Sequence, residues 1–184
     1  MNETQLLLLL AAIFAVSFLS LWLVEAVSFY RKYHGKRVIV CPETKKDEEV
    51  QVAAAAGAAR ILLGPDLHLK NCTRWPERAG CGQDCLSQIE ESPEECLAGE
   101  IARHWYEGKA CAVCGKPFVH MEWHQHRPGL LAPDGRTLLW SEVPLRELRE
   151  TLATHKPLCW QCHIHEGFRH EHPELVTDRA AHQR

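Results

Sequence analysis

The feature that most constrains this chain is an apolar run near its N-terminus. Residues 6–24 read LLLLLAAIFAVSFLSLWLV, with two serines and no charged residue. An α-helix rises about 1.5 Å per residue, so roughly 20 such residues cross a hydrocarbon core about 30 Å thick. A cleaved signal peptide is disfavoured, because the leader MNET has no lysine or arginine and the run exceeds the usual core of about 7–15 residues. The sequence therefore predicts one membrane-spanning helix.

Positive charge differs between the two sides of this run. The N-terminal side has no lysine or arginine, whereas the other side soon carries Arg31, Lys32, Lys36 and Arg37. These residues are enriched on the cytoplasmic side of membrane helices. We therefore expect a single-pass protein of the plasma (inner) membrane of a bacterium, with its N-terminus outside and its body in the cytoplasm.

Cysteine is abundant beyond the run. The nine cysteines are Cys41, Cys72, Cys81, Cys85, Cys96, Cys111, Cys114, Cys159 and Cys162. In a reducing compartment clustered thiols more often hold metal than form disulfides. The predicted cytoplasmic location therefore favours metal binding.

Composition divides the chain into an anchor and two small modules of an α+β protein. Each module is expected to contain β-hairpins and short helices and to be stabilised by metal. The expected segments are an anchor at 1–30, a basic juxtamembrane linker at 31–36, a cysteine-rich α+β module at 37–90, a connecting helix at 91–107, a second cysteine-rich module at 108–170 and a polar tail at 171–184.

Local patterns predict the elements of the first module. The segments RVIVC and EVQVA flank the turn-rich PETKKD, which indicates a hairpin, and LHLKNC indicates a third strand. A short helix is expected in AAAAGAARILLG and another in GQDCLSQIEE. Ser92 followed by Pro93 is typical of a helix start, and this helix is expected to run to about Tyr106.

The second module shows a similar mixture. PFVHMEW is expected to be a strand, and GLLAPDGRTLLW a hairpin around its Pro-Asp-Gly turn. Ser141 is expected to cap a helix that extends to Leu152. A last short helix is expected to begin at the second Cys-x-x-Cys pair.

Two Cys-x-x-Cys pairs lie in this second module. They consist of Cys111, Cys114, Cys159 and Cys162. Zinc prefers four ligands in a tetrahedron, and a glycine directly after a pair, as at Gly115, eases the tight bend that turns both thiolates to one point. Because a module of about 70 residues rarely has enough core to be stable alone, a shared zinc ion would help it fold.

The segment CAVCGK, followed by a strand, a hairpin and the CWQC pair, resembles a zinc-ribbon or treble-clef finger over residues 108–168. In such fingers the first pair forms a knuckle and the second often begins a helix. The resemblance implies a structural zinc site. This chain departs from the compact pattern, because 44 residues separate the pairs instead of roughly 15–20.

The second pair also permits a different cofactor. Cys159-Trp160-Gln161-Cys162-His163 matches the C-x-x-C-H attachment signature of haem c, with Cys159 and Cys162 as attachment points and His163 as axial ligand. Haem c is normally attached outside the cytoplasm, so the predicted topology disfavours it.

The first module has a less regular set of cysteines, all at the ends of predicted elements. These are Cys41, Cys72, Cys81 and Cys85. A second four-thiolate site is a further prediction, with zinc and an iron–sulfur cluster both open as occupants, and scattered buried thiols as the alternative. Cys96 is expected to pack as a small apolar residue.

Histidines gather in the second half of the chain. His124 and His126 would share one face of a strand, and four more lie near its end: His163, His165, His170 and His172. Surface positions are favoured over another metal site, because no H-E-x-x-H spacing is present.

Other functional classes find little support in the sequence. The net charge is −3 without a basic stripe, so nucleic acid is not an expected partner. No G-x-S-x-G motif, phosphate loop or small-molecule site is evident, and an enzyme is not favoured. We expect a membrane-anchored zinc protein that serves as a scaffold for another protein. The alternatives are a membrane-anchored electron carrier with an iron–sulfur cluster or haem c, and, with less support, a thiol oxidoreductase.

Overall fold

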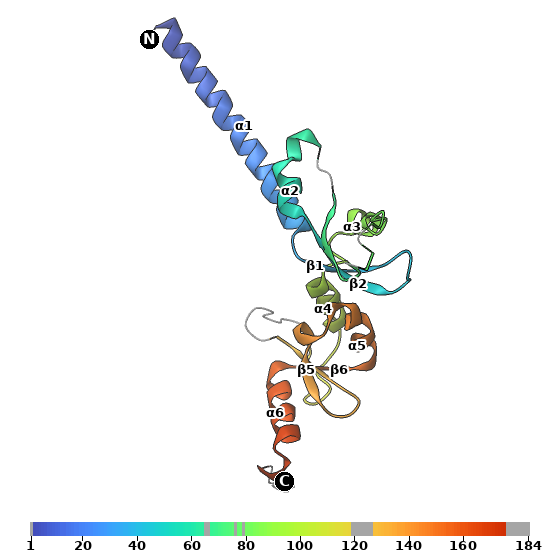
Figure 1. The fold of residues 1–184 in the computed structure, drawn as a ribbon. Coiled ribbons are helices and arrows are strands. Elements are labelled where there is room, and N and C mark those ends of the chain that lie inside the picture. Colours follow the sequence, from blue (N-terminus) through green and yellow to red (C-terminus); the bar gives the residue numbers. More distant parts are fainter. Residues whose placement is uncertain (1, 65–66, 76, 79, 119–126, 176–184) are drawn as a thin grey trace. The chain divides into compact units, whose positions relative to one another are not determined.

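The computed structural model describes residues 2–64, 67–75, 77–78, 80–118 and 127–175 (Figure 1). It is a mixed α+β protein with a long apolar N-terminal helix and two small sheets, as the sequence predicts. The chain forms two compact units, Met1–Leu97 and Ala98–Arg184. Each unit is described separately below.

Helix α1 comprises Glu3–Tyr33 and is 31 residues long. At about 1.5 Å per residue it measures about 46 Å, which exceeds a hydrocarbon core of about 30 Å. Its apolar side chains from Leu6 to Val24 are largely exposed, whereas Ala26 and Tyr33 are buried against the rest of the unit. The helix is long and apolar enough to cross a membrane. The expected linker, 31–36, contains the end of α1, two connecting residues and the first residue of β1.

A three-stranded antiparallel sheet follows α1, with strand order β1–β2–β3. The strands are β1 (Lys36–Val40), β2 (Asp47–Val52) and β3 (Leu69–Cys72). They confirm the predicted hairpin and third strand. Because β1 and β3 both run antiparallel to β2, their C-terminal ends lie at the same edge of the sheet. This edge carries two of the cysteines of the first unit.

Helix α2 (Ala54–Ala59) and the 3-10 turn η1 (Ile61–Leu63) lie alongside the last part of α1 (Figure 1). Gly57 permits this close approach, since a Cβ atom there would lie 2.4 Å from Cε1 of Phe29. The predicted short helix is therefore present, and it ends before Gly64, whose φ is +94°.

The chain then returns to β1 through α3 (Leu86–Glu91). Gln88 of α3 accepts a hydrogen bond from the Val40 amide at 3.1 Å and donates one to the Val40 carbonyl at 2.7 Å. Further on, the Val38 amide donates to the Cys96 carbonyl at 2.8 Å, and Leu97 forms a β-bridge with Arg37. Both segments therefore hold the outer edge of β1.

This pairing corrects the predicted helix start at Ser92. Helix α4 (Ala98–Tyr106) begins six residues later, and Ser92 instead ends α3. The local signal of Ser92 and Pro93 is genuine, but the backbone of Cys96 and Leu97 is used to extend the sheet. Tertiary pairing has overridden local propensity here.

The second unit contains a small antiparallel sheet of order β5–β4–β6. Its strands are β4 (Gly129–Leu131), β5 (Thr137–Leu139) and β6 (Lys156–Leu158). The first two strands confirm the predicted Pro-Asp-Gly hairpin, in which Gly135 has a φ of +87°. Tyr106 of α4 is buried and donates a hydrogen bond to the Gly129 carbonyl at 2.7 Å.

The remaining helices differ in part from the prediction. Helix α5 (Leu148–Thr154) begins seven residues after Ser141, behind two 3-10 turns, η2 (Trp140–Glu142) and η3 (Leu145–Glu147). Pro144 lies between these turns and lacks the amide that a continuous helix would need. Helix α6 (Trp160–Glu171) begins at the second cysteine pair, as predicted, and η4 (Pro173–Leu175) follows it. Most of the predicted strand PFVHMEW lies outside the described residues, and so do His124 and His126, which follow it.

Candidate metal centre

The first Cys-x-x-Cys pair lies in a tight loop whose two ends are held together by backbone pairing. Ala110 forms a β-bridge with Pro117, and the Cys111 amide donates to the Lys116 carbonyl at 2.9 Å. Inside the loop the Gly115 amide donates to the Cys111 carbonyl at 2.9 Å. Gly115 has a φ of +72°, a conformation that glycine adopts without strain. This loop, residues 111–116, is called the C-terminal knuckle below.

The second pair joins the knuckle through β6. The Ala112 amide donates to the carbonyl of Pro157 in β6 at 2.8 Å, and the Cys159 amide points at Sγ of Cys111 at 3.4 Å. Cys159 directly precedes α6, and Cys162 lies in its first turn. The start of α6 therefore presents both thiols to the knuckle.

The four sulfurs form one compact group. Those of Cys111, Cys114, Cys159 and Cys162 all lie within 4.8 Å of one another. Sγ of Cys114 and Sγ of Cys159 are 3.7 Å apart. Four sulfurs bound at about 2.3 Å to a tetrahedral ion would be about 3.8 Å apart, so the spacing fits a single metal ion. The group is compatible with the ligand set of a zinc ribbon.

The pKa values of two thiols in this group are shifted in opposite directions. Burial raises the pKa of Cys111, but N–H groups of the backbone at Cys114, Cys159 and Val113 outweigh it and lower the pKa to about 6. Burial and the neighbouring thiols raise the pKa of Cys162. The thiolate form is thus favoured at Cys111 and disfavoured at Cys162. A divalent cation bound between the sulfurs would reduce the repulsion between two thiolates.

The arrangement does not favour the haem alternative. Haem attachment would use Cys159 and Cys162, which are grouped with the thiols of the knuckle. His163, the expected axial ligand, packs tightly on β4, since a Cβ atom at Gly129 would lie 2.8 Å from Cβ of His163. Nδ1 of His163 is buried without a hydrogen-bond partner among the described residues.

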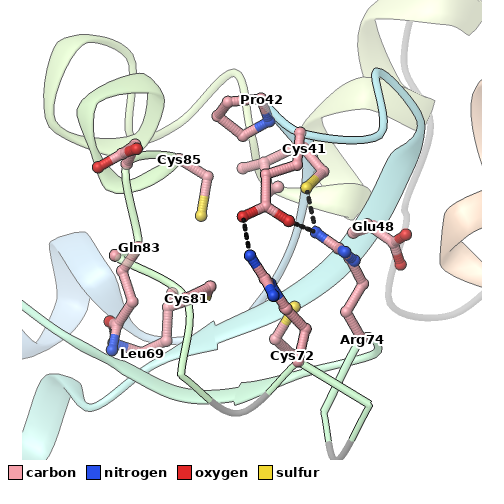
Figure 2. Close-up of a pocket in the computed structure, with 14 residues that line it drawn as sticks. Cys41, Pro42, Glu48, Leu69, Cys72, Arg74, Cys81, Gln83 and Cys85 are labelled. Carbon is pink, nitrogen blue, oxygen red and sulfur yellow. Dashed lines mark hydrogen bonds and ion pairs between the residues drawn. The ribbon is translucent and has the colours of Figure 1, made fainter.

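Four cysteines of the first unit line one cavity of about 40 Å³ at the edge of the sheet (Figure 2). Cys41 directly follows β1, Cys72 ends β3, and Cys81 and Cys85 lie in the loop before α3. Gln83 fastens this loop to the sheet, because its side-chain oxygen accepts a hydrogen bond from the Leu69 amide at 2.8 Å. In the described part of the chain, only the group in the second unit has all its ligand atoms within 4.8 Å, so these four thiols are spaced more widely.

The thiols of the first unit nevertheless affect one another. Burial raises the pKa of Cys85 to about 11, with further contributions from the thiols of Cys72, Cys81 and Cys41. The pKa of Cys72 is also raised, first by burial. Cys96, by contrast, is buried in the core and does not line the cavity; its thiol lies 3.6 Å from the Gln88 carbonyl. The expectation that Cys96 packs in the core is confirmed.

A charged pair at the rim of the cavity was not foreseen from the sequence. Arg74 donates a hydrogen bond from Nη1 to Sγ of Cys41 at 3.1 Å and pairs with Glu43 at 2.8 Å. Arg78 also reaches Glu43, at 3.4 Å. In the sequence, only proximity to a cysteine could have indicated this pair: Arg74 lies two residues after Cys72, and Glu43 lies two residues after Cys41.

Several of the described histidines in the second unit lie at its surface. His165 and His170 are exposed on α6, and no group of three ligands that includes a histidine is found among the described residues.

No family model, no curated protein and no solved structure matches this chain. The resemblance to a zinc ribbon therefore extends to its ligand cluster and does not assign a family.

Proposed function

We propose that this chain is a single-pass protein of the plasma (inner) membrane whose cytoplasmic body is stabilised by zinc and serves as an interaction scaffold. The observation that carries the proposal is the close group of Cys111, Cys114, Cys159 and Cys162. Helix α1 supports the anchor by its length and composition. The cations that follow the apolar run, from Arg31 to Arg37, support the orientation.

Zinc suits this group better than the redox alternatives. The sulfur spacing is that of one tetrahedral ion, and thiolates are soft ligands that zinc accepts readily. Four protein thiolates fill all four positions, so no position remains for a substrate or an activated water. The ion therefore has a structural role, and it joins the knuckle to β6 and α6.

Metal analysis of the full chain in detergent tests the proposal. Replacing Cys111→Ser together with Cys114→Ser should remove about one zinc per chain and unfold the second unit, because binding and folding of such sites are coupled. Cys96→Ser is the matched control, as it removes a buried thiol outside the group, and it should retain the full metal content.

Two results would contradict the proposal. One is an unchanged zinc content in the double variant at Cys111 and Cys114. The other is a wild-type protein that absorbs visible light and loses this absorption in the double variant. That result would indicate iron–sulfur or haem at the same residues.

A further inference from the structure

The loop that follows β1 has the same backbone design as the C-terminal knuckle. The Cys41 amide donates to the Lys46 carbonyl at 2.8 Å, as the Cys111 amide does to Lys116 at 2.9 Å. The Lys45 amide donates to the Cys41 carbonyl at 2.8 Å, as the Gly115 amide does to Cys111 at 2.9 Å. The two loops therefore correspond residue by residue over positions 41–46 and 111–116.

The correspondence extends to an unusual backbone angle. Lys45 has a φ of +56° and occupies the position of Gly115, whose φ is +72°. A non-glycine residue in this conformation carries strain that the surrounding structure must compensate. Because Lys45 adopts this conformation although it is not a glycine, we infer that the shape of the loop at Cys41 is important.

The shape of both loops directs backbone amides at the first cysteine. Backbone N–H groups at Thr44 and Glu43 help to lower the pKa of Cys41 against the effect of burial, and those at Cys114 and Val113 do the same for Cys111. Thr44 stands where the C-terminal knuckle has its second cysteine. A metal bound by the first loop must therefore obtain its other ligands from elsewhere in the unit.

Three further thiols are available at the same cavity. Figure 2 shows the side chains of Cys41, Cys72, Cys81 and Cys85 around one space at the sheet edge. The volume of about 40 Å³ would hold an ion or a few water molecules. It is far below the roughly 300–1,000 Å³ of sites for small organic ligands.

The rim supplies the charge that such a centre would need. Four thiolates around one divalent ion have a net charge of −2. Arg74 contacts Cys41 directly, and Arg78 lies beside it on the shared partner Glu43. Glu43 and Glu48 also line the cavity, and the carboxylate of Glu43 is paired with both guanidinium groups. An N–H group that donates to a ligand sulfur also fixes the orientation of that ligand.

We propose that Cys41, Cys72, Cys81 and Cys85 hold a second zinc ion in the first unit, with Cys41 presented by a knuckle that uses one cysteine instead of two. The comparison of the loops rests on the proposed function of the C-terminal knuckle, but the ligands are separate residues. The sulfurs must approach one another when the ion binds, because they are spaced more widely than those of the second unit.

The zinc content of the full chain in detergent tests this inference. The wild type should contain two zinc ions per chain, and Cys72→Ser with Cys85→Ser should contain one. The control Cys96→Ser removes a buried thiol of the same unit outside the cavity and should contain two. The double variant at Cys111 and Cys114 should also contain one.

The outcomes separate the two sites. If the wild type contains one zinc and the Cys72/Cys85 variant keeps it, the second site is refuted and the proposed function stands. If the Cys111/Cys114 variant keeps all its zinc while the Cys72/Cys85 variant loses it, the proposed function fails and the second site stands. A brown wild type that becomes colourless in the Cys72/Cys85 variant would overturn zinc as the occupant.

A measurement on the wild type avoids variants that fail to fold. Cys81 is only half-buried, so alkylation followed by mass spectrometry reports whether its sulfur is bound. We expect Cys81 to resist alkylation in the metal-loaded protein and to react at least tenfold faster after a chelator has removed the metal. Equal rates before and after chelation would refute Cys81 as a ligand and, with it, the four-thiolate site.

Discussion

Arg37 shows how one side chain can join the long apolar helix α1 to the sheet that follows it. It is fully buried, although arginine is seldom found in that state. Its guanidinium donates hydrogen bonds to the carbonyl of Lys32 at 2.6 Å and to that of Tyr33 at 2.7 Å, at the end of α1. The carbonyl of His34 is a further acceptor at 3.2 Å. Helix ends leave such carbonyls without partners and carry partial negative charge, so Arg37 satisfies both needs.

Loss of this side chain should loosen the join between α1 and the first sheet. We expect Arg37→Met to destabilise the first unit by about 1–3 kcal/mol, because buried carbonyls lose their donor. Hydrogen exchange of the β1 amides in detergent would measure the effect. Arg31→Met is the control, since Arg31 is exposed in the last turn of the same helix. Comparable exchange in both variants would contradict a role for the buried guanidinium.

For single residues, the sequence identified the candidate metal ligands but not the arginines that contact the residues around them. The spacing within each Cys-x-x-Cys pair constrains the two thiols directly, so the grouping of Cys111 with Cys114 follows from local geometry. Arg37 was counted only as one of several cations near the membrane, because its burial depends on carbonyls whose positions are set by the end of α1. Arg74 was missed for the same reason, since its contact with Cys41 joins residues 33 positions apart.

Helix α6 offers the clearest exposed apolar surface in the second unit. Ile164 and Phe168 are 52% and 48% exposed, and residues four apart lie on the same face of a helix. The helix begins at the metal group, so a bound ion would hold this face in place. We expect the partner of the proposed scaffold to contact these two side chains.

A photo-crosslinking residue placed at Ile164 should therefore give a specific protein adduct in living cells. The same residue at His170, which is exposed two positions after Phe168 and hence on a different face, should give little adduct. The adduct at position 164 should decrease at least fivefold when Phe168→Asp is added. Equal crosslinking from both positions would contradict a binding face on α6.

Elements with a local signal were predicted well. Both hairpins combine β-branched or leucine-rich arms with turn residues, and both are present. The start of α4 could not be predicted, because the backbone of Cys96 and Leu97 pairs with β1, a contact between residues about 60 positions apart. The long apolar helix and the two small sheets could thus be predicted from the sequence, whereas the element boundaries set by such long-range pairings could not.

For the molecule as a whole, the proposed orientation in the membrane can be tested directly. We expect a tag placed after Arg184 to be protected from protease added outside intact spheroplasts, since the cations that follow the apolar run favour a cytoplasmic location for the body. A tag placed before the apolar run in the same protein should be digested, which is the internal control. Digestion of the C-terminal tag with protection of the N-terminal one would reverse the topology and remove the argument for a reducing environment.

The junction made by Arg37 has a mechanical consequence. Helix α1 continues without a break into the first unit, where α2 lies against it at Gly57 and the guanidinium closes its last turn. A spanning helix changes its tilt when the bilayer becomes thinner or thicker. Because the sheet is joined to the end of this helix, we expect a change in the tilt of the helix to be transmitted to the sheet and to its cysteine-lined end.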